Sequence, residues 1–201
     1  MVKMNKEKHE KINKKLKNSS VGIAGLGGLG SNAAIALIRA GVGRLVLVDF
    51  DVVEKSNLTR QYYFLDQIGK PKTIALQDNI RKINSNVLIN LYNEKLDKGS
   101  MEKRFKDVDV VIEALDSAET KTAFVEEILT KLPNKPIVSA SGVAGYGHSD
   151  RINTKRLGNL HMCYDESAPS CDEDILSAPR VALMANWEAN LAIEIILGED
   201  K

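Results

Sequence analysis

A glycine-rich run near the start of the chain, GLGGLG at residues 25–30, has the spacing G-x-G-x-x-G between a predicted strand and a predicted helix. In this pattern Gly25 allows a tight turn, and Gly30 lets the helix pack closely on the sheet. Gly27 and Gly28 let backbone N–H groups approach phosphate oxygens, which also gain from the dipole at the start of the helix. The run therefore predicts a nucleotide phosphate site, but it does not distinguish NAD from ATP.

Charged side chains after the glycine run indicate a ribose site, a phosphate site and a metal site. Asp49 comes 19 residues after Gly30, at the end of the next predicted strand, where its carboxylate can accept hydrogen bonds from both ribose hydroxyls. Arg60 and Lys72 follow and could neutralise a triphosphate tail, whereas the phosphates of a dinucleotide are already held by the glycine turn. Asp116 follows a further strand at the carboxyl edge of the sheet and is placed to hold Mg²⁺, which prefers oxygen ligands and bridges phosphates.

Four runs between about residues 21 and 139 carry a resemblance to a known family. They are GIAGLGGLGSN, VDFDVVEKSNLTRQYYF, IGKPK and EALDSAETK, and SNLTRQ within them is highly characteristic. The sequence resembles the ThiF/MoeB group of ubiquitin-activating-enzyme-like adenylyltransferases. The short length and the run SAPRVALMANWEANL near the end are most similar to the compact ThiF proteins of thiamine biosynthesis.

The resemblance implies an activity, cofactors and partners. Enzymes of this group use ATP and Mg²⁺ to adenylylate the C-terminal glycine of a small ubiquitin-fold sulfur carrier, here a ThiS-like protein ending in Gly-Gly, and they release pyrophosphate. They usually act as homodimers. The expected activity is that of a nucleotidyltransferase in which positioning and charge neutralisation carry most of the catalysis, because a carboxylate must attack an anionic phosphorus group.

Positions in the family motifs assign roles to individual residues. Arg60 and Lys72 are expected to hold the phosphate tail and Asp116 the metal, so these three form the expected catalytic set. Each has an ordinary alternative, which is a surface ion pair for Arg60, a solvated helix position for Lys72 and a helix cap for Asp116. Asn57 and Gln61 are expected to orient phosphate and metal through hydrogen bonds. Asp51 is expected to have a structural or secondary metal role. The expected nucleotide-binding residues are Gly25, Gly27, Gly28, Gly30, Asp49, Asp51, Asn57, Arg60, Gln61 and Lys72.

Two features of the group are missing from this sequence. Larger members carry two C-x-x-C pairs that bind zinc, and no such pair occurs here, so zinc is not expected. Many members also bring an N-terminal arginine into the site of the partner subunit. No arginine precedes Arg39, and Lys14 or Lys15 could replace it, although lysine offers a point charge rather than a planar fork.

Two cysteines, Cys163 and Cys171, could form a covalent intermediate with the carrier, as some members of the group do. Cys171 precedes the acidic run DED, which should raise the pKa of a thiol rather than activate it. A structural or incidental role is the preferred interpretation for both cysteines. The glycine-rich residues 141–147 could line a channel for the extended tail of the carrier or form a plain turn.

Alternating strands and helices must position these residues. Short apolar runs predict strands at residues 21–24, 44–48, 87–91, 109–112 and 136–140, and helical spacing predicts helices at 31–40, 70–83, 118–132 and 181–197. This alternation predicts an α/β, Rossmann-like fold with a mainly parallel sheet flanked by helices. Residues 154–179 show no periodicity and are expected to form a long irregular loop before the C-terminal helix.

Charge is unevenly distributed along the chain. The 201 residues carry 28 Lys and Arg against 27 Asp and Glu, so the net charge of +1 gives no overall attraction to nucleic acid or membranes. Seven lysines lie in residues 1–20, where Ile12 and Leu16 indicate a short helix. We expect this lysine-rich segment to precede a single ATP-binding adenylyltransferase domain at residues 21–201.

No long apolar stretch or secretory leader occurs in the sequence, so a cytoplasmic protein is expected.

Two alternative functions remain open. A related ATP-dependent enzyme could activate a carboxylate on tRNA, although the mildly acidic composition beyond residue 20 disfavours it. An NAD-dependent oxidoreductase or a non-catalytic nucleotide-binding module shares the glycine turn, but neither needs basic residues at the positions of Arg60 and Lys72.

Overall fold

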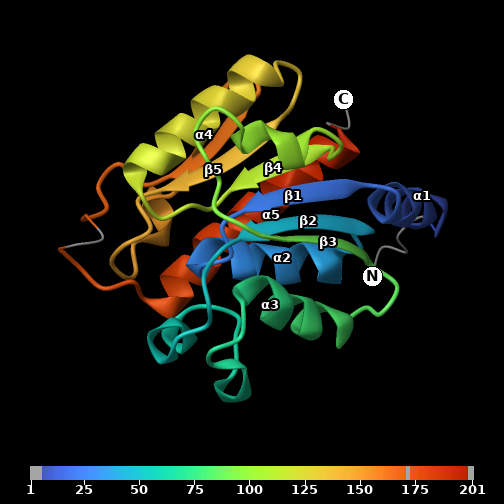
Figure 1. Ribbon diagram of the computed structural model, residues 1–201. Helices are drawn as coiled ribbons and strands as arrows, with labels where there is room; N and C mark the ends of the chain where they lie inside the picture. Colours follow the sequence, from blue (N-terminus) through green and yellow to red (C-terminus); the bar gives the residue numbers. More distant parts are fainter. Residues whose placement is uncertain (1–5, 171–172, 199–201) are drawn as a thin grey trace.

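The apolar runs of the sequence become the strands of one seven-stranded sheet. The computed structural model describes residues 6–170 and 173–198, and its strands lie in the order β3-β2-β1-β4-β5-β7-β6 (Figure 1). All are parallel except β6, which runs antiparallel to β7. The Rossmann-like, mainly parallel fold predicted from the alternating pattern is therefore confirmed. The strands are β1 Ser20–Ala24, β2 Arg44–Asp49, β3 Leu88–Asn93, β4 Val110–Glu113, β5 Ile137–Ser141, β6 Asn153–Leu157 and β7 Leu160–Tyr164.

Helices cover both faces of this sheet. The α-helices are α1 Lys6–Lys17, α2 Gly28–Ala40, α3 Lys72–Arg81, α4 Ala118–Lys131 and α5 Ala178–Leu197, and the 3₁₀ helices are η1 Lys55–Thr59, η2 Leu65–Gln67, η3 Met101–Phe105 and η4 Ser149–Arg151. On one face α2, α3 and α5 pack through buried side chains that include Ile35, Leu76 and Met184. On the other face, which carries α4 in Figure 1, Phe105 and Phe124 meet edge to face with their ring centroids 5.3 Å apart.

The strand order reverses between β1 and β4, and this reversal decides where a ligand site can form. Strand β1 pairs with β2 on one side and with β4 on the other. The chain therefore leaves β1 and β4 in opposite directions along the sheet edge, which opens a crevice beyond their carboxyl ends. The glycine turn follows β1, and the connection at residues 114–117 follows β4, so both lie at this crevice.

The prediction of a long irregular loop at residues 154–179 is wrong for the first part of that segment. Residues 153–164 form the hairpin of β6 and β7, which completes one edge of the sheet. Every residue of β6 is exposed, and Cys163 is the single fully buried residue of β7. The hydrophobic pattern did not predict this hairpin, because strands with so few buried residues show no alternation of apolar and polar residues.

Three helices begin at positions that differ from the predicted ones. Helix α2 begins at Gly28, inside the glycine run, so its N-terminus lies at the turn itself. Helix α3 begins at Lys72, directly after Pro71. Helix α5 begins at Ala178 with Pro179 in its first turn, where a missing N–H costs no hydrogen bond.

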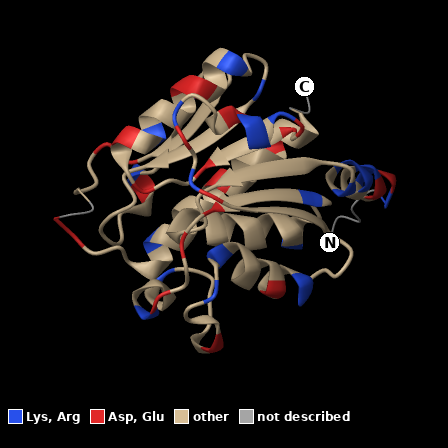
Figure 2. Ribbon diagram, viewed as in Figure 1, with Lys and Arg blue, Asp and Glu red and all other residues tan. Residues whose placement is uncertain are grey.

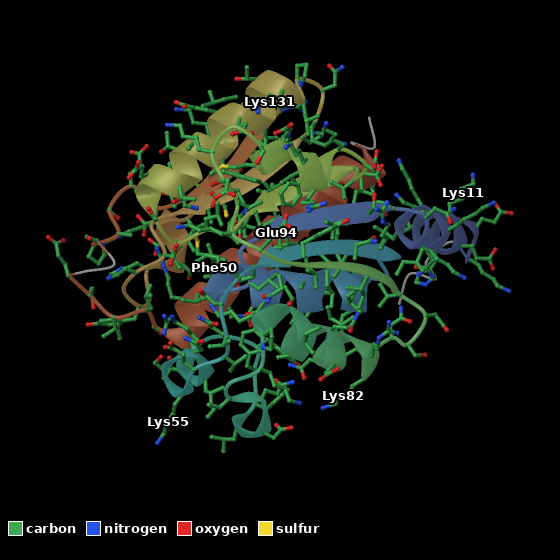
Figure 3. The ribbon with its side chains drawn as sticks, in the orientation of Figure 1. Lys11, Phe50, Lys55, Lys82, Glu94 and Lys131 are labelled. Atoms are coloured by element: carbon green, nitrogen blue, oxygen red, sulfur yellow. The ribbon has the colours of Figure 1, made fainter. Side chains whose placement is uncertain are left out.

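Helix α1 is the short helix that Ile12 and Leu16 predicted, and it lies far from the crevice. Leu16 is buried, and Lys15 Nζ donates a hydrogen bond of 2.7 Å to the carbonyl oxygen of Leu197 at the end of α5. Figure 3 shows Lys11 on α1 and Phe50, which directly follows β2, toward opposite ends of the sheet. None of the helices within the described ranges combines the length and apolar character needed to cross a bilayer.

Candidate nucleotide site

The glycine turn joins β1 to α2 at the crevice and brings several elements into close contact. Gly25 has a φ of 89°, a value that favours glycine, and a Cβ there would lie 2.5 Å from the carbonyl oxygen of Ala114. A Cβ at Gly30 would lie 1.9 Å from the Gly25 carbonyl oxygen, and one at Gly28 would lie 2.8 Å from Val181 Cγ1. The turn is therefore packed against the end of β4 and the first turn of α5, with no room for side chains at these positions.

Asp49 ends β2 with a carboxylate that is tied to the glycine turn. Its side chain is buried, Oδ2 accepts a hydrogen bond of 2.6 Å from the backbone N–H of Leu26, and Oδ1 accepts one of 2.7 Å from the N–H of Asp51. Each carboxylate oxygen keeps a further lone pair. The acid is thus held in a fixed orientation with acceptor capacity left for the hydroxyls of a ribose.

Two side chains that the sequence analysis did not single out hold the turn in place. Asn32 Nδ2 donates to the carbonyl oxygens of Gly28 at 2.7 Å and of Arg60 at 2.9 Å. The Tyr63 hydroxyl donates to the carbonyl oxygen of Leu26 at 2.8 Å, and burial raises the pKa of Tyr63 far above its ordinary value, so it remains a donor. Both residues stand inside the family runs, but no spacing rule marks them as supports of the turn.

Arg60 and Gln61 lie beside the turn with polar groups that the described residues leave unused. The side chain of Arg60 passes within 3.8 Å of the Cβ position at Gly28, and its guanidinium contacts only η1, at 3.2 and 3.4 Å, with no carboxylate partner in the described ranges. Gln61 Oε1 is buried and has no hydrogen-bond partner among the described residues, while Nε2 lies 3.8 Å from the Cβ position at Gly27. A buried polar atom without a partner is costly, and a ligand seated at the turn would supply one.

Lys72 and Asp51 form an ion pair next to this cluster. Lys72 Nζ lies 2.7 Å from Asp51 Oδ2, and the lysine side chain is 7% exposed against 44% for the aspartate. The backbone N–H of Lys72 also donates to the carbonyl oxygen of Asp51 at 2.9 Å. Lys72 is therefore not a solvated helix residue, and Asp51 has the structural role of holding the lysine.

The structure uses Asn57 as a cap. Asn57 Oδ1 accepts a hydrogen bond of 3.0 Å from the backbone N–H of Glu54, and the backbone N–H of Asn57 donates one of 3.0 Å to the carbonyl oxygen of Glu54. This reciprocal arrangement fixes the first turn of η1. The described structure does not bring the Asn57 amide to the glycine turn.

Asp116 lies on the connection from β4 to α4, whose first residue touches the glycine turn. Its side chain is exposed, and Oδ1 accepts a hydrogen bond of 2.8 Å from the backbone N–H of Ser117. The N-cap of α4 is Ser117, whose hydroxyl accepts from the N–H of Thr120 at 3.4 Å. Asp116 is therefore not the cap of this helix, and Oδ2 has no partner in the described part of the chain.

A metal at Asp116 would need further oxygen ligands from a nucleotide. Within residues 6–170 and 173–198, no three His, Cys, Asp or Glu side chains are grouped so that they could hold a metal ion. Mg²⁺ is usually held by one or two carboxylates together with substrate phosphates. A single exposed carboxylate beside a phosphate turn fits that mode of binding, whereas a structural zinc ion needs four protein ligands.

The cysteines differ in what the structure says of them. Cys163 is fully buried, and its Sγ lies 3.9 Å from the carbonyl oxygens of Ser139 and Met184. Burial raises the pKa of the Cys163 thiol far above its ordinary value, so this residue is unsuited to nucleophilic attack. Cys171 lies outside the described residues.

A cavity of about 170 Å³ lies farther along the same sheet edge. Its lining comes from the glycine-rich segment after β5, from the loop after β7 and from Arg180 at the start of α5. The buried guanidinium of Arg180 donates to the carbonyl oxygens of Gly142 at 3.2 Å and Gly147 at 3.0 Å, and it pairs with Asp165 at 2.6 Å. The next residue, Val181, packs on the glycine turn, so the cavity adjoins the candidate nucleotide site.

Fold and site together define a Rossmann-like protein with a glycine turn, a buried acid at the end of β2 and, among the described residues, polar groups without partners at the point where the strand order reverses. A model of the ThiF family matches residues 3–201. The chain belongs to the ThiF family, as its motifs indicated.

Curated relatives share about a third of their matched residues with this chain. It is 31% identical over 191 residues to the adenylyltransferase and sulfurtransferase UBA4 of Candida albicans, covering 92% of this chain and 43% of that protein. It is 33% identical over 186 residues to the adenylyltransferase and sulfurtransferase MOCS3 of Caenorhabditis briggsae, covering 88% of this chain and 45% of that protein. The chain spans less than half the length of these relatives.

Solved structures share the fold at lower identity. The E. coli tRNA N6-threonylcarbamoyladenosine dehydratase TcdA in complex with ATP has a TM-score of 0.85 at 20% identity, covering 94% of this chain and 89% of that chain. E. coli MccB with ATP has a TM-score of 0.72 at 24% identity, covering 92% of this chain and 57% of that chain. These similarities establish the shared architecture.

Proposed function

We propose that this chain uses ATP to adenylylate the C-terminal glycine carboxylate of a small ubiquitin-like sulfur carrier, a ThiS-like protein ending in Gly-Gly. The observation that carries the proposal is that the Arg60 guanidinium, without a carboxylate partner among the described residues, and the partnerless Gln61 oxygen lie beside the glycine turn, while Asp116 is exposed on the connection whose first residue touches that turn. A triphosphate supplies acceptors for the Arg60 guanidinium and metal-ligating oxygens beside Asp116, and a hydroxyl or amine of the nucleoside supplies a donor for the Gln61 oxygen.

The proposed reaction joins two anions, so it depends on positive charge and positioning. A carboxylate oxygen of the carrier forms a bond to the α-phosphorus of ATP, the bond from that phosphorus to the bridging oxygen breaks, and pyrophosphate leaves with the electron pair. Backbone N–H groups at the start of α2 hold the α-phosphate, Asp49 orients the ribose, and Arg60 with Lys72 neutralises the phosphate tail. Asp116 would hold Mg²⁺, which supplies further neutralisation of the leaving pyrophosphate when it is bound.

The relatives support adenylyl transfer from ATP. UBA4 and MOCS3 are named as adenylyltransferases, and TcdA and MccB share this fold in complexes with ATP. We further propose that the chain serves thiamine biosynthesis, because the run SAPRVALMANWEANL resembles the compact ThiF proteins, and that it acts as a cytoplasmic homodimer, as that resemblance implies.

Replacement of Asp116 by alanine tests the proposal. We expect Asp116→Ala to lower carrier-dependent exchange of labelled pyrophosphate into ATP by at least about 100-fold, comparable to the loss of a preorganised group at the reacting centre. The matched control is Glu119→Ala, which removes an exposed acid one position into α4 and should leave exchange near the wild-type rate. Circular dichroism checks that both variants fold. If Asp116→Ala exchanges pyrophosphate into ATP within a few-fold of the wild-type rate, the metal-binding role proposed for Asp116 is contradicted.

A second candidate function is the activation of a carboxylate on tRNA, and the charge of α1 favours it. This helix carries six lysines and two glutamates, and it lies at one end of the molecule, where its lysine positions are coloured blue along the ribbon (Figure 2). Such a surface can attract a polyanion even when the net charge of the chain is near zero. The same exchange assay separates the two functions, because pyrophosphate exchange that requires tRNA instead of the carrier supports the second.

A further inference from the structure

One buried carboxylate links the ends of β4, β5 and the first turns of α4. Glu113, the last residue of β4, has no exposed side-chain surface. Its Oε2 accepts hydrogen bonds from Lys121 Nζ at 2.5 Å and from the Ser139 hydroxyl at 2.6 Å, while Oε1 accepts one from the backbone N–H of Leu115 at 2.8 Å. Lys121 Nζ also donates to the carbonyl oxygen of Ala140 at 3.2 Å. The carboxylate therefore connects two strands, one helix and the chain segment that leaves β4.

These bonds hold the short connection at residues 114–117 from both ends. The bond from Leu115 to Glu113 sets the direction in which the chain leaves the strand. The cap of α4 by Ser117 and the anchoring of that helix through Lys121 set the other end. Asp116 lies between these two anchors, so the position of its backbone follows from theirs.

The charges around Glu113 explain why this acid can serve as an anchor. Two fully buried acids, Glu113 and Glu188, face the single ammonium group of Lys121. Glu113 takes the ammonium as a direct partner, whereas neither carboxylate oxygen of Glu188 has a partner in the described ranges. A buried charge is tolerated when it is paired and hydrogen-bonded, which is the state of Glu113.

We propose that Glu113, anchored by Lys121, is a positioning residue that fixes the 114–117 connection and so places the Asp116 carboxylate at the crevice. The inference rests on the role proposed for Asp116 in the adenylylation site. Glu113 acts through the backbone N–H of Leu115, because its own side chain is inaccessible to a nucleotide.

A matched pair of double variants tests this inference. Glu113→Gln with Lys121→Met and Glu113→Met with Lys121→Met both remove the buried ion pair and keep a side chain of similar length. Only glutamine retains an oxygen that can accept from the Leu115 N–H. Any difference between the two variants therefore reports on that hydrogen bond rather than on the lost charges.

The first readout is hydrogen exchange of the Leu115 amide in protein without nucleotide. We expect exchange to stay slow in the glutamine variant and to become at least about tenfold faster in the methionine variant. The second readout is the Mg²⁺ concentration that gives half-maximal pyrophosphate exchange, which should rise at least about tenfold in the methionine variant alone, as loss of a positioning partner does elsewhere. Affinity for ATP without metal, measured by calorimetry, should be the same in both.

Equal amide exchange, or equal metal dependence, in the two double variants overturns the inference. If the methionine variant does not fold, Glu113→Leu with Lys121→Met takes its place under the same two criteria. The result for Asp116→Ala is independent of this comparison. If the two double variants behave alike while Asp116→Ala still abolishes exchange, the positioning role of Glu113 is overturned and the proposed function stays intact.

Discussion

Glu188 shows how burial without a partner sets the charge of a single residue. It is fully buried on α5, and both of its carboxylate oxygens lack a hydrogen-bond partner among the described residues. Burial raises the pKa of Glu188 well above its ordinary value of 4.5, although the charge of Lys121 acts in the opposite direction. Burial therefore favours the neutral form of this acid.

Glu188→Gln should stabilise the protein, and more so as the pH rises. The folded state keeps a proton that the unfolded state releases above about pH 4.5, so the wild type loses stability as the pH rises from there. Glutamine has no proton to release, and we expect the free energy of unfolding of the variant to exceed that of the wild type at pH 8, with little difference at pH 4. Urea titrations at both pH values measure this. A gain that does not change with pH, or an equal gain for the exposed Glu194→Gln on the same helix, would contradict it.

The first turn of α5 is the element that joins the candidate site to the cavity beside it. Arg180 and Asp165 are each 4% exposed, and the guanidinium also holds the backbone of the glycine-rich segment through Gly142 and Gly147. Val181 packs against the glycine turn. One helical turn thus fixes two loops that follow different strands, which makes the position of this helix part of the site.

Arg180→Met should be strongly destabilising because it leaves the buried carboxylate of Asp165 without its partner. Loss of one member of a buried ion pair costs about 3–5 kcal/mol. The matched control is Arg151→Met, since Arg151 is exposed at the same cavity and its guanidinium makes, among the described residues, only a 3.5 Å contact with the Ser167 hydroxyl. That change should stay within about 0.5 kcal/mol. Chemical denaturation measures the free energy of unfolding of both variants. A similar loss in the two would show that the buried ion pair contributes no more to stability than the exposed contact.

At the scale of the whole molecule, the lysines of α1 and the candidate site lie at opposite ends of the sheet. Helix α1 leads into the amino end of β1, and the glycine turn follows its carboxyl end. Lys14 or Lys15 can therefore serve the nucleotide only from a partner subunit. The homodimer proposed above provides such a partner through a symmetric contact.

Mixing two inactive variants tests this contribution in trans. In a mixed dimer of Arg60→Ala and Lys14→Ala/Lys15→Ala subunits, one of the two sites would have its own arginine and its partner's lysines. Random assembly then predicts about a quarter of the wild-type rate of pyrophosphate exchange. Light scattering of the mixture establishes the oligomeric state. If dimers form and the mixture stays as inactive as its components, the lysines of α1 do not serve the neighbouring site.

The candidate site was predictable where it depends on local spacing and not where it depends on distant partners. The glycine run, Asp49 and the position of Asp116 after a strand were readable because each follows a nearby element. The cap at Asn57 could not be read from the motif, because the reciprocal bond with Glu54 forms only once η1 is folded. The hairpin of β6 and β7 was missed because an exposed edge strand carries no hydrophobic period.

The sequence by itself determined the family, the alternation of strands and helices and the phosphate turn, because these depend on residue types at short separations along the chain. Only the tertiary structure decided that Lys72 pairs with Asp51, that Glu113 rather than Glu188 takes the ammonium of Lys121, and that the first turn of α5 closes on the glycine turn. Those outcomes depend on which strands become neighbours and on how much water is excluded between them. Both are properties of the assembled sheet, and neither is carried by any one segment of the chain.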